Sequence, residues 1–174
     1  MAENTNNREF VDIVVNVRRV TKVTKGGKRF SFSALAVSGN QEGKVGFALG
    51  KGNEVKQAID KAIVRARKNM FELPLRNTTL PFEVQGKHGA TRVVLRPAYK
   101  GTGVIAGGAV RAVMMAVGVK DVLGKIVFGS RNPQNVLKAT LNALAHARSA
   151  AHLAHLRNQS VRDLVRGKNV SSAA

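Results

Sequence analysis

The stretch from Tyr99 to Gly118, YKGTGVIAGGAVRAVMMAVG, constrains the fold most, because a glycine-rich loop there runs directly into an apolar helix. Such a loop presents backbone N–H groups and the positive end of a helix dipole, which together suit a bound phosphate. A nucleotide phosphate would indicate an enzyme, whereas a nucleic-acid phosphate would indicate a binding module. Close packing of helix on sheet explains Gly107 and Gly108 equally well, and both roles can hold together.

The residues around this loop disfavour a nucleotide site. Mg²⁺ needs carboxylate oxygens, and the second half of the chain offers only Glu83, Asp121 and Asp163. No Gly-Lys-Ser/Thr follows the loop, and Ala106 stands where a dinucleotide fold requires its third glycine. We therefore predict no catalytic residues, no cofactor and no enzymatic activity.

Charge points to a polyanionic partner. The 174 residues include 29 Lys and Arg but only 10 Asp and Glu, for a net charge of +19. The excess is +8 up to Thr78 and +11 beyond it, so it belongs to the whole body and not to one tail. A surface of this charge repels itself unless polyanion surrounds it.

Several other sites and locations are disfavoured by composition. The chain has no cysteine, which excludes disulfides and thiolate metal sites. His146, His152 and His155 lack a carboxylate partner, so we predict no metal site. The first residues, MAENTNN, do not form a signal peptide, and no apolar run approaches ~20 residues. We expect an intracellular protein without a membrane partner.

The first half predicts a βββα unit over residues 10–73, after a flexible leader over residues 1–9. Alternating β-branched residues predict strands over 10–23, 30–37 and 44–49, joined by turns at 24–29 and 38–43. Asn53 is the expected N-cap of a helix whose apolar stripe runs from Val55 to Met70.

A linker over 74–79 leads to a ββαβα unit over 80–149. We expect strands over 82–84, 91–95 and 122–128, with the first turn at 86–89. One helix spans 104–117 and ends at Gly118, and Asn132-Pro133 starts the second. In the partly helical tail over 150–174, residues 149–156 extend that helix and Ser160 to Asp163 form a capping box. The fold class is α+β.

The hairpin at 24–29 is the best candidate for a nucleic-acid contact. Lys22, Lys25, Lys28 and Arg29 crowd its tip, and at this net charge we favour contact over simple solvation. Aromatic residues make up only 5% of the chain, which disfavours base-stacking modules. Recognition of folded RNA by shape and phosphate fits better than regulation of DNA.

Three segments resemble the family of bacterial small-subunit ribosomal protein five. They are VRRVTKVTKGGKRFSFSALAVSGN, KVGFALGKGNEVKQAIDKA and GTGVIAGGAVRAVMMAVGVKDVLGKIVFGSRNPQNVLKAT, within a match from Phe10 to Ala147. The resemblance implies a double-stranded-RNA-binding-like first unit and a second unit like the GHMP small-molecule kinases, with a left-handed βαβ crossover. Fold kinship alone keeps a kinase as the rival hypothesis, and a free-standing RNA chaperone is a third.

The resemblance also implies a function: a non-enzymatic, structural constituent of the cytoplasmic small ribosomal subunit that binds 16S rRNA. It would support subunit assembly and influence translational accuracy. The implied neighbours are small-subunit proteins four and eight, with protein three and the side where mRNA enters nearby, and no obligate homo-oligomer. Changes in the loop matching Val20 to Arg29 are associated in the family with spectinomycin resistance. Candidate RNA-binding residues are Arg18, Arg19, Thr21, Lys22, Lys25, Gly26, Gly27, Lys28, Arg29, Lys51, Lys87, Lys100 and Arg131, and candidate protein-interface residues are Gly101, Gly103 and Arg111.

Overall fold

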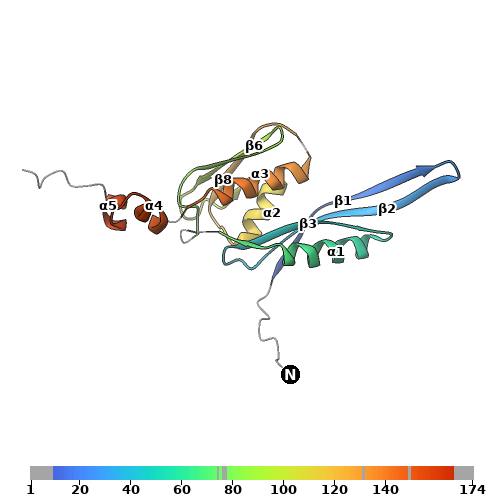
Figure 1. Ribbon diagram of the computed structural model, residues 1–174, viewed down its shortest axis with the longest axis horizontal. Helices are drawn as coiled ribbons and strands as arrows, with labels where there is room; N and C mark the ends of the chain where they lie inside the picture. The colour runs from blue at the N-terminus through green and yellow to red at the C-terminus, as the bar shows by residue number, and fades with distance from the viewer. Residues whose placement is uncertain (1–9, 74, 76–77, 131, 149, 167–174) are drawn as a thin grey trace, which may run out of the picture.

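The computed structural model describes residues 10–73, 75, 78–130, 132–148 and 150–166 (Figure 1). The expected leader over 1–9, part of the expected linker and the end of the tail lie outside the described residues, as does Arg131. What is described is an α+β fold with two four-stranded sheets, as the sequence predicts.

The first sheet has the strand order β1-β2-β3-β4, with each neighbouring pair antiparallel. Its strands are β1 (Val11–Thr24), β2 (Gly27–Gly39), β3 (Lys44–Gly52) and β4 (Phe71–Glu72). Strand β3 pairs only with residues 32–39 of β2, so the outer part of the β1–β2 hairpin has no third strand and projects from the body (Figure 1). The hairpin turns at Lys25 and Gly26, because Thr24 pairs directly with Gly27.

Helix α1 (Val55–Lys68) covers one face of this sheet. Ala58, Ala62 and Ala66 are fully buried, and the first two pack against Ala34 and Ala36 of β2. Small side chains at these positions let the helix approach the sheet closely. The N-cap is Glu54, not Asn53 as expected, since β3 continues to Gly52 and the first helical bond runs from Ala58 N–H to the Glu54 carbonyl.

The second sheet has the order β5-β6-β8-β7, from β5 (Val84–His88), β6 (Thr91–Pro97), β8 (Val122–Phe128) and β7 (Val104–Ile105). The first turn lies at Gly89 and Ala90, later than the predicted 86–89. It lies there because Gly86, Lys87 and His88 pair with β6 as part of strand β5. The predicted strand over 122–128 is confirmed.

Helix α2 (Gly108–Val117) begins four residues later than predicted, because Val104 and Ile105 pair with β8 as parallel strand β7. Its end at Gly118 is confirmed: Gly118 has φ +94° and donates to the Met114 carbonyl. Helix α3 (Pro133–Ala145) starts as predicted, with the Asn132 side chain accepting from Gln134 N–H.

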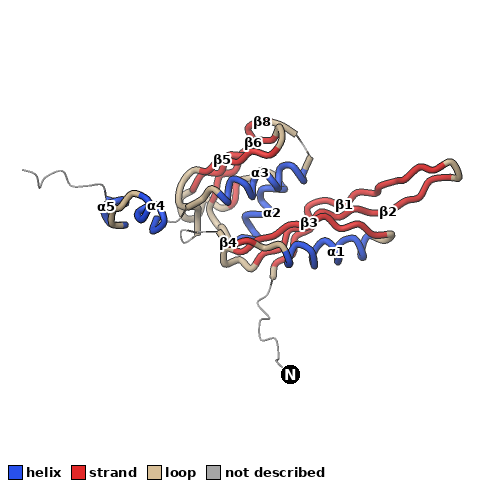
Figure 2. Tube along the Cα trace, viewed as in Figure 1, coloured by secondary structure: helices blue, strands red, loops and turns tan. Residues whose placement is uncertain are grey.

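Helix α2 lies between the two sheets and joins them into one core (Figure 2). Met114 and Val117 are fully buried in the same cluster as Val37 of β2 and Leu95 of β6. At the far end of α2, Gln41 N–H donates to the Ala116 carbonyl at 3.1 Å and Gly43 N–H to the Val117 carbonyl at 3.0 Å. The β2–β3 turn thus caps the helix of the second unit.

The tail contains two short helices, α4 (Ala150–Leu156) and α5 (Val161–Arg166), beside the main body (Figure 1). The expected continuation of α3 into 149–156 is wrong, because α3 ends at Ala145 with His146 as its C-cap. The predicted capping box is confirmed in part: Asp163 N–H donates to the Ser160 hydroxyl, and the return bond to the Asp163 carboxylate comes from that same hydroxyl.

Candidate nucleic-acid interface

The outer β1–β2 hairpin is an exposed ribbon of positive charge. Between Asn16 and Ala34 it carries basic residues at six positions and no Asp or Glu. Every residue from Val17 to Phe30 is exposed. In the part of the chain that the structure describes, no ion pair uses a hairpin cation. These charges are therefore free to meet an anionic partner. The hairpin holds most of the predicted RNA-binding residues: Arg18, Arg19, Thr21, Lys22, Lys25, Gly26, Gly27, Lys28 and Arg29.

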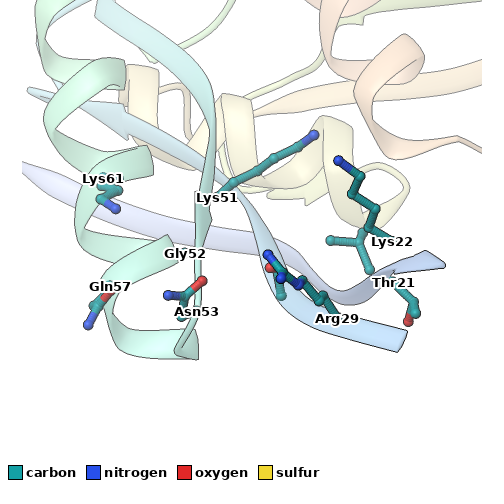
Figure 3. Close-up of a pocket in the computed structure, with 10 residues that line it drawn as sticks. Thr21, Lys22, Arg29, Lys51, Gly52, Asn53, Gln57 and Lys61 are labelled. Carbon is teal, nitrogen blue, oxygen red and sulfur yellow. The ribbon is translucent and has the colours of Figure 1, made fainter. Parts of the chain in front are cut away.

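A groove of about 530 Å³ lies where the hairpin meets the start of α1 (Figure 3). Lys22 and Lys51 extend toward one another from β1 and β3, and the Arg29 side chain points from β2 toward the side of the groove where the helix lies. Lys61 adds a fourth cation from α1, and no carboxylate lines the groove. Lysine and arginine are the side chains with which proteins neutralise the phosphates of a nucleic-acid backbone.

Four polar residues of this groove, Ser31 of β2 and three others, were not singled out from the sequence as site residues. Asn53, Gln57 and Lys61 lie on the α1 side (Figure 3). Gln57 and Lys61, four residues apart, lie on one face of α1, and Asn53 lies two residues before the helix begins. The spacing of Gln57 and Lys61 is a signal that the sequence already contained. What the sequence lacked was the position of that face beside the hairpin, which depends on how α1 packs on the sheet.

Other predicted RNA-binding residues lie elsewhere. Lys87 is exposed on β5 and Lys100 on the glycine-rich loop, so both belong to the second unit and do not line the groove. Arg18 lines a second, smaller hollow with Asn132 and Gln134 at the start of α3. Arg131 lies outside the described residues.

The glycine-rich loop contains an internal anion. Gly101 N–H and Gly103 N–H both donate to Oδ1 of Asp121, at 2.9 and 3.1 Å. Both glycines have positive φ, +94° and +77°, which turns their N–H groups inward. The Asp121 residue is only 4% exposed. Two of the backbone donors that could cradle a phosphate at this loop are therefore already used by a carboxylate.

The same contacts shift the titration of Asp121. The Gly103 N–H lowers its pKa most, Thr78, Gly101 and Lys100 lower it further, and desolvation opposes them. The charged form is thus favoured. The backbone of Asp121 also holds the segment before the second unit, since its N–H donates to the Thr78 carbonyl and its carbonyl accepts from the Thr79 hydroxyl.

Helix-on-sheet packing does not require glycine at positions 107 and 108, contrary to one explanation of these residues. A Cβ at Gly107 would meet only Ile126 Cδ1 at 3.8 Å, and one at Gly108 would meet nothing within 4 Å. The glycines under the helices lie elsewhere: a Cβ at Gly50 would reach 2.1 Å from the Ala58 carbonyl oxygen and one at Gly86 2.2 Å from that of Ala139.

The structure brings the three predicted protein-interface residues to one corner. Gly101 and Gly103 share the Asp121 carboxylate. The exposed Arg111, in the first turn of α2, donates from its guanidinium to the Val104 carbonyl at 3.3 Å.

Among the described residues no cluster of His, Asp and Glu is arranged to hold a metal, and no described helix could span a membrane.

Comparison with known proteins identifies the family. Residues 10–74 match the model of "Ribosomal protein S5, N-terminal domain" and residues 86–157 match "Ribosomal protein S5, C-terminal domain". The chain belongs to the ribosomal protein S5 family. This family is structural and non-enzymatic, so a kinase reading of the second unit is set aside.

Relatives in the S5 family cover nearly the whole chain. The small ribosomal subunit protein uS5 of Syntrophobacter fumaroxidans is 54% identical over 90% of this chain and 93% of the relative. Those of Lawsonia intracellularis and Bacteroides thetaiotaomicron are 53% and 49% identical, over 86% and 94% of this chain and 91% and 94% of the relative. The resemblance inferred from the sequence is thereby confirmed.

Proposed function

We propose that this chain is a structural constituent of the small ribosomal subunit and binds 16S rRNA through the hairpin and the groove beside it. The observation that carries the proposal is the groove itself, with Lys22, Arg29, Lys51 and Lys61 and no carboxylate. The names of its S5 relatives, all small ribosomal subunit proteins, support the same location in the cytoplasmic ribosome.

Phosphate contacts would provide most of the binding energy. The hairpin projects beyond β3, so it can reach into folded RNA while the body remains outside (Figure 1). Contacts of this kind fix position and register and carry no sequence information directly. Lys87 and Lys100 would contact rRNA from the second unit, separately from the groove. We also propose that the chain divides into two structural units, residues 10–73 and residues 80–149.

The corner formed by Gly101, Gly103 and Arg111 would contact small-subunit protein four. Its loop is held by Asp121, so its outer surface is presented in a fixed shape. Protein eight would pack on the C-terminal part of the chain, with protein three and the side where mRNA enters nearby. Through these neighbours the protein would support assembly and influence translational accuracy, without forming an obligate homo-oligomer.

Co-sedimentation tests the proposal. Small subunits are washed in high salt, pelleted and probed for the tagged full-length chain. An integral constituent should remain in the pellet at stoichiometric amount, because many contacts act together. Complete release by the wash, with the chain recovered as free protein, would instead indicate a free-standing RNA-binding protein and contradict the proposal.

A further inference from the structure

One face of the hairpin carries an aromatic ring stacked with a guanidinium. The guanidinium carbon of Arg19 lies 3.6 Å from the centroid of the Phe30 ring. The strand register explains the contact: Arg19 pairs with Phe32 and Thr21 with Phe30, so Arg19 and Phe30 are diagonal neighbours on the same face. Phe30 is still 48% exposed.

This face is distinct from the one that directs Lys22 and Arg29 toward the groove. Lys22 pairs with Arg29, one residue out of step with Thr21 and Phe30, and successive strand residues point to opposite sides. Beyond Phe30 the stacked face carries Val23, which is 69% exposed, and Lys28. No third strand pairs with this part of the hairpin.

Phe30 differs from the other exposed aromatic residues in its surroundings. Four of the eight aromatic side chains are exposed, Phe10, Phe30, Tyr99 and Phe128, and Phe30 is the one that lies on the basic hairpin, with a guanidinium carbon 3.6 Å from its ring centroid. Guanidinium planes and aromatic rings are the two surfaces on which proteins stack unpaired bases. Hairpin cations around the pair would hold the flanking phosphates.

We propose that the Arg19–Phe30 pair is a stacking site for one unpaired nucleobase of RNA. The inference rests on the proposed function, since it concerns the same RNA. The inference specifies a feature of the RNA that phosphate contacts alone do not need, namely an unpaired base that is turned out of a helix or held in a loop. It also modifies the expectation from aromatic content, because one well-placed ring can provide a stacking site where composition gives none.

The test uses the full-length chain and two RNA probes. One is a stem–loop with 2-aminopurine in the loop, whose fluorescence falls when the base stacks, and the other is a blunt duplex of the same stem. The absence of Trp keeps the protein background low. The unaltered protein should quench the loop probe on binding. Phe30→Leu should bind that probe about tenfold more weakly, as expected for one lost base–aromatic stack, and bind the duplex unchanged.

Matched variants separate stacking from charge and from folding. Arg19→Lys keeps the charge and removes the planar group, so quenching should weaken while the salt dependence of binding stays the same. Phe30→Tyr should restore quenching, and Val23→Leu, on the same face, should leave it unchanged. Thermal unfolding checks that each variant folds.

Two outcomes would overturn the inference, and they differ in what else they affect. If the protein binds both probes with normal salt dependence but Phe30→Leu changes neither affinity nor quenching, the stacking site is wrong and RNA binding stands. If the unaltered protein binds neither probe, the stacking site and the proposed function fall together.

Discussion

Asp121 is the residue on which the glycine-rich loop depends. The sequence showed it as one of three carboxylates in the second half, too few for a nucleotide site. It could not show that the carboxylate itself would occupy the loop, because Asp121 is 18 and 20 residues from the two N–H groups it binds. A loop that resembles a phosphate cradle is here folded around an internal anion, which leaves its outer surface for contact.

Acid should loosen this loop, and Asp121→Asn should remove part of that sensitivity. The Gly103 N–H and its companions lower the folded-state pKa of Asp121 below its ordinary value of 3.8. A lowered folded-state pKa gives stability that is complete above the unfolded pKa and is lost as the pH falls through the folded one. The melting temperature of the unaltered protein should therefore drop as pH falls below about 4.

Melting curves between pH 2.5 and 6 check this prediction. Asp121→Asn should melt lower than the unaltered protein at pH 6, with the difference shrinking toward pH 2.5. Parallel curves across the whole range would show that the carboxylate charge does not stabilise the loop.

Gly103→Arg separates backbone strain from loss of an interface. A Cβ at Gly103 would meet nothing within 4 Å, so a large side chain fits, while φ of +77° costs about 1–2 kcal/mol for any residue but glycine. The isolated protein should lose about that much stability in urea unfolding. Its association with small-subunit protein four should fall further than strain explains, because the side chain would stand on the proposed contact. Unchanged association would place that contact elsewhere.

At the level of elements, local signals were predictable and long-range pairing was not. Asn132-Pro133 and Ser160 to Asp163 were recognised as helix starts, since a cap is made by residues adjacent in sequence. Helix α2 was predicted four residues too long, because Val104 and Ile105 become a strand only through pairing with Val122 and Leu123. The hairpin was predictable from alternation and its Gly-containing turn.

Gly118→Ala should disrupt the joint between α2 and the β2–β3 turn, by which we mean the hydrogen bonds from Gln41 and Gly43 N–H to the last carbonyls of α2. A Cβ there would lie 2.0 Å from the Gln41 carbonyl oxygen, and φ is +94°. Strain alone costs about 1–3 kcal/mol, and the clash must also displace the turn whose N–H groups cap α2. Urea unfolding should show a loss of at least that size.

Gly108→Ala is the matched control within the same helix. A Cβ at Gly108 meets nothing within 4 Å and its φ is not in the left-handed region, so Ala should be tolerated or stabilise by about 0.4–1 kcal/mol. Equal stability for Gly118→Ala and Gly108→Ala would mean that the joint does not contribute to stability.

For the whole molecule, charge was the most informative property of the sequence. A net charge of +19, spread over both halves, predicted a polyanionic partner before any element was placed. The sequence divides the chain into two units but does not indicate which of them α2 contacts, and in the structure α2 is buried between both sheets in a shared core. An apolar sequence pattern predicts that a helix is buried but does not identify the residues that it packs against. The groove likewise needed the packing of α1 to become visible.

The salt dependence of binding to 16S rRNA tests the central claim most directly. Filter-binding titrations would compare the unaltered chain, the double variant Lys22→Ala/Arg29→Ala and the control Lys44→Ala. Lys44 lies at the other end of β3, where it pairs with Glu72 at 3.8 Å. Each lost phosphate contact lowers the slope of log affinity against log salt by about 0.9. The double variant should therefore lose nearly two units of slope and the control almost none, whereas equal slopes for all three proteins would exclude the groove from the RNA interface.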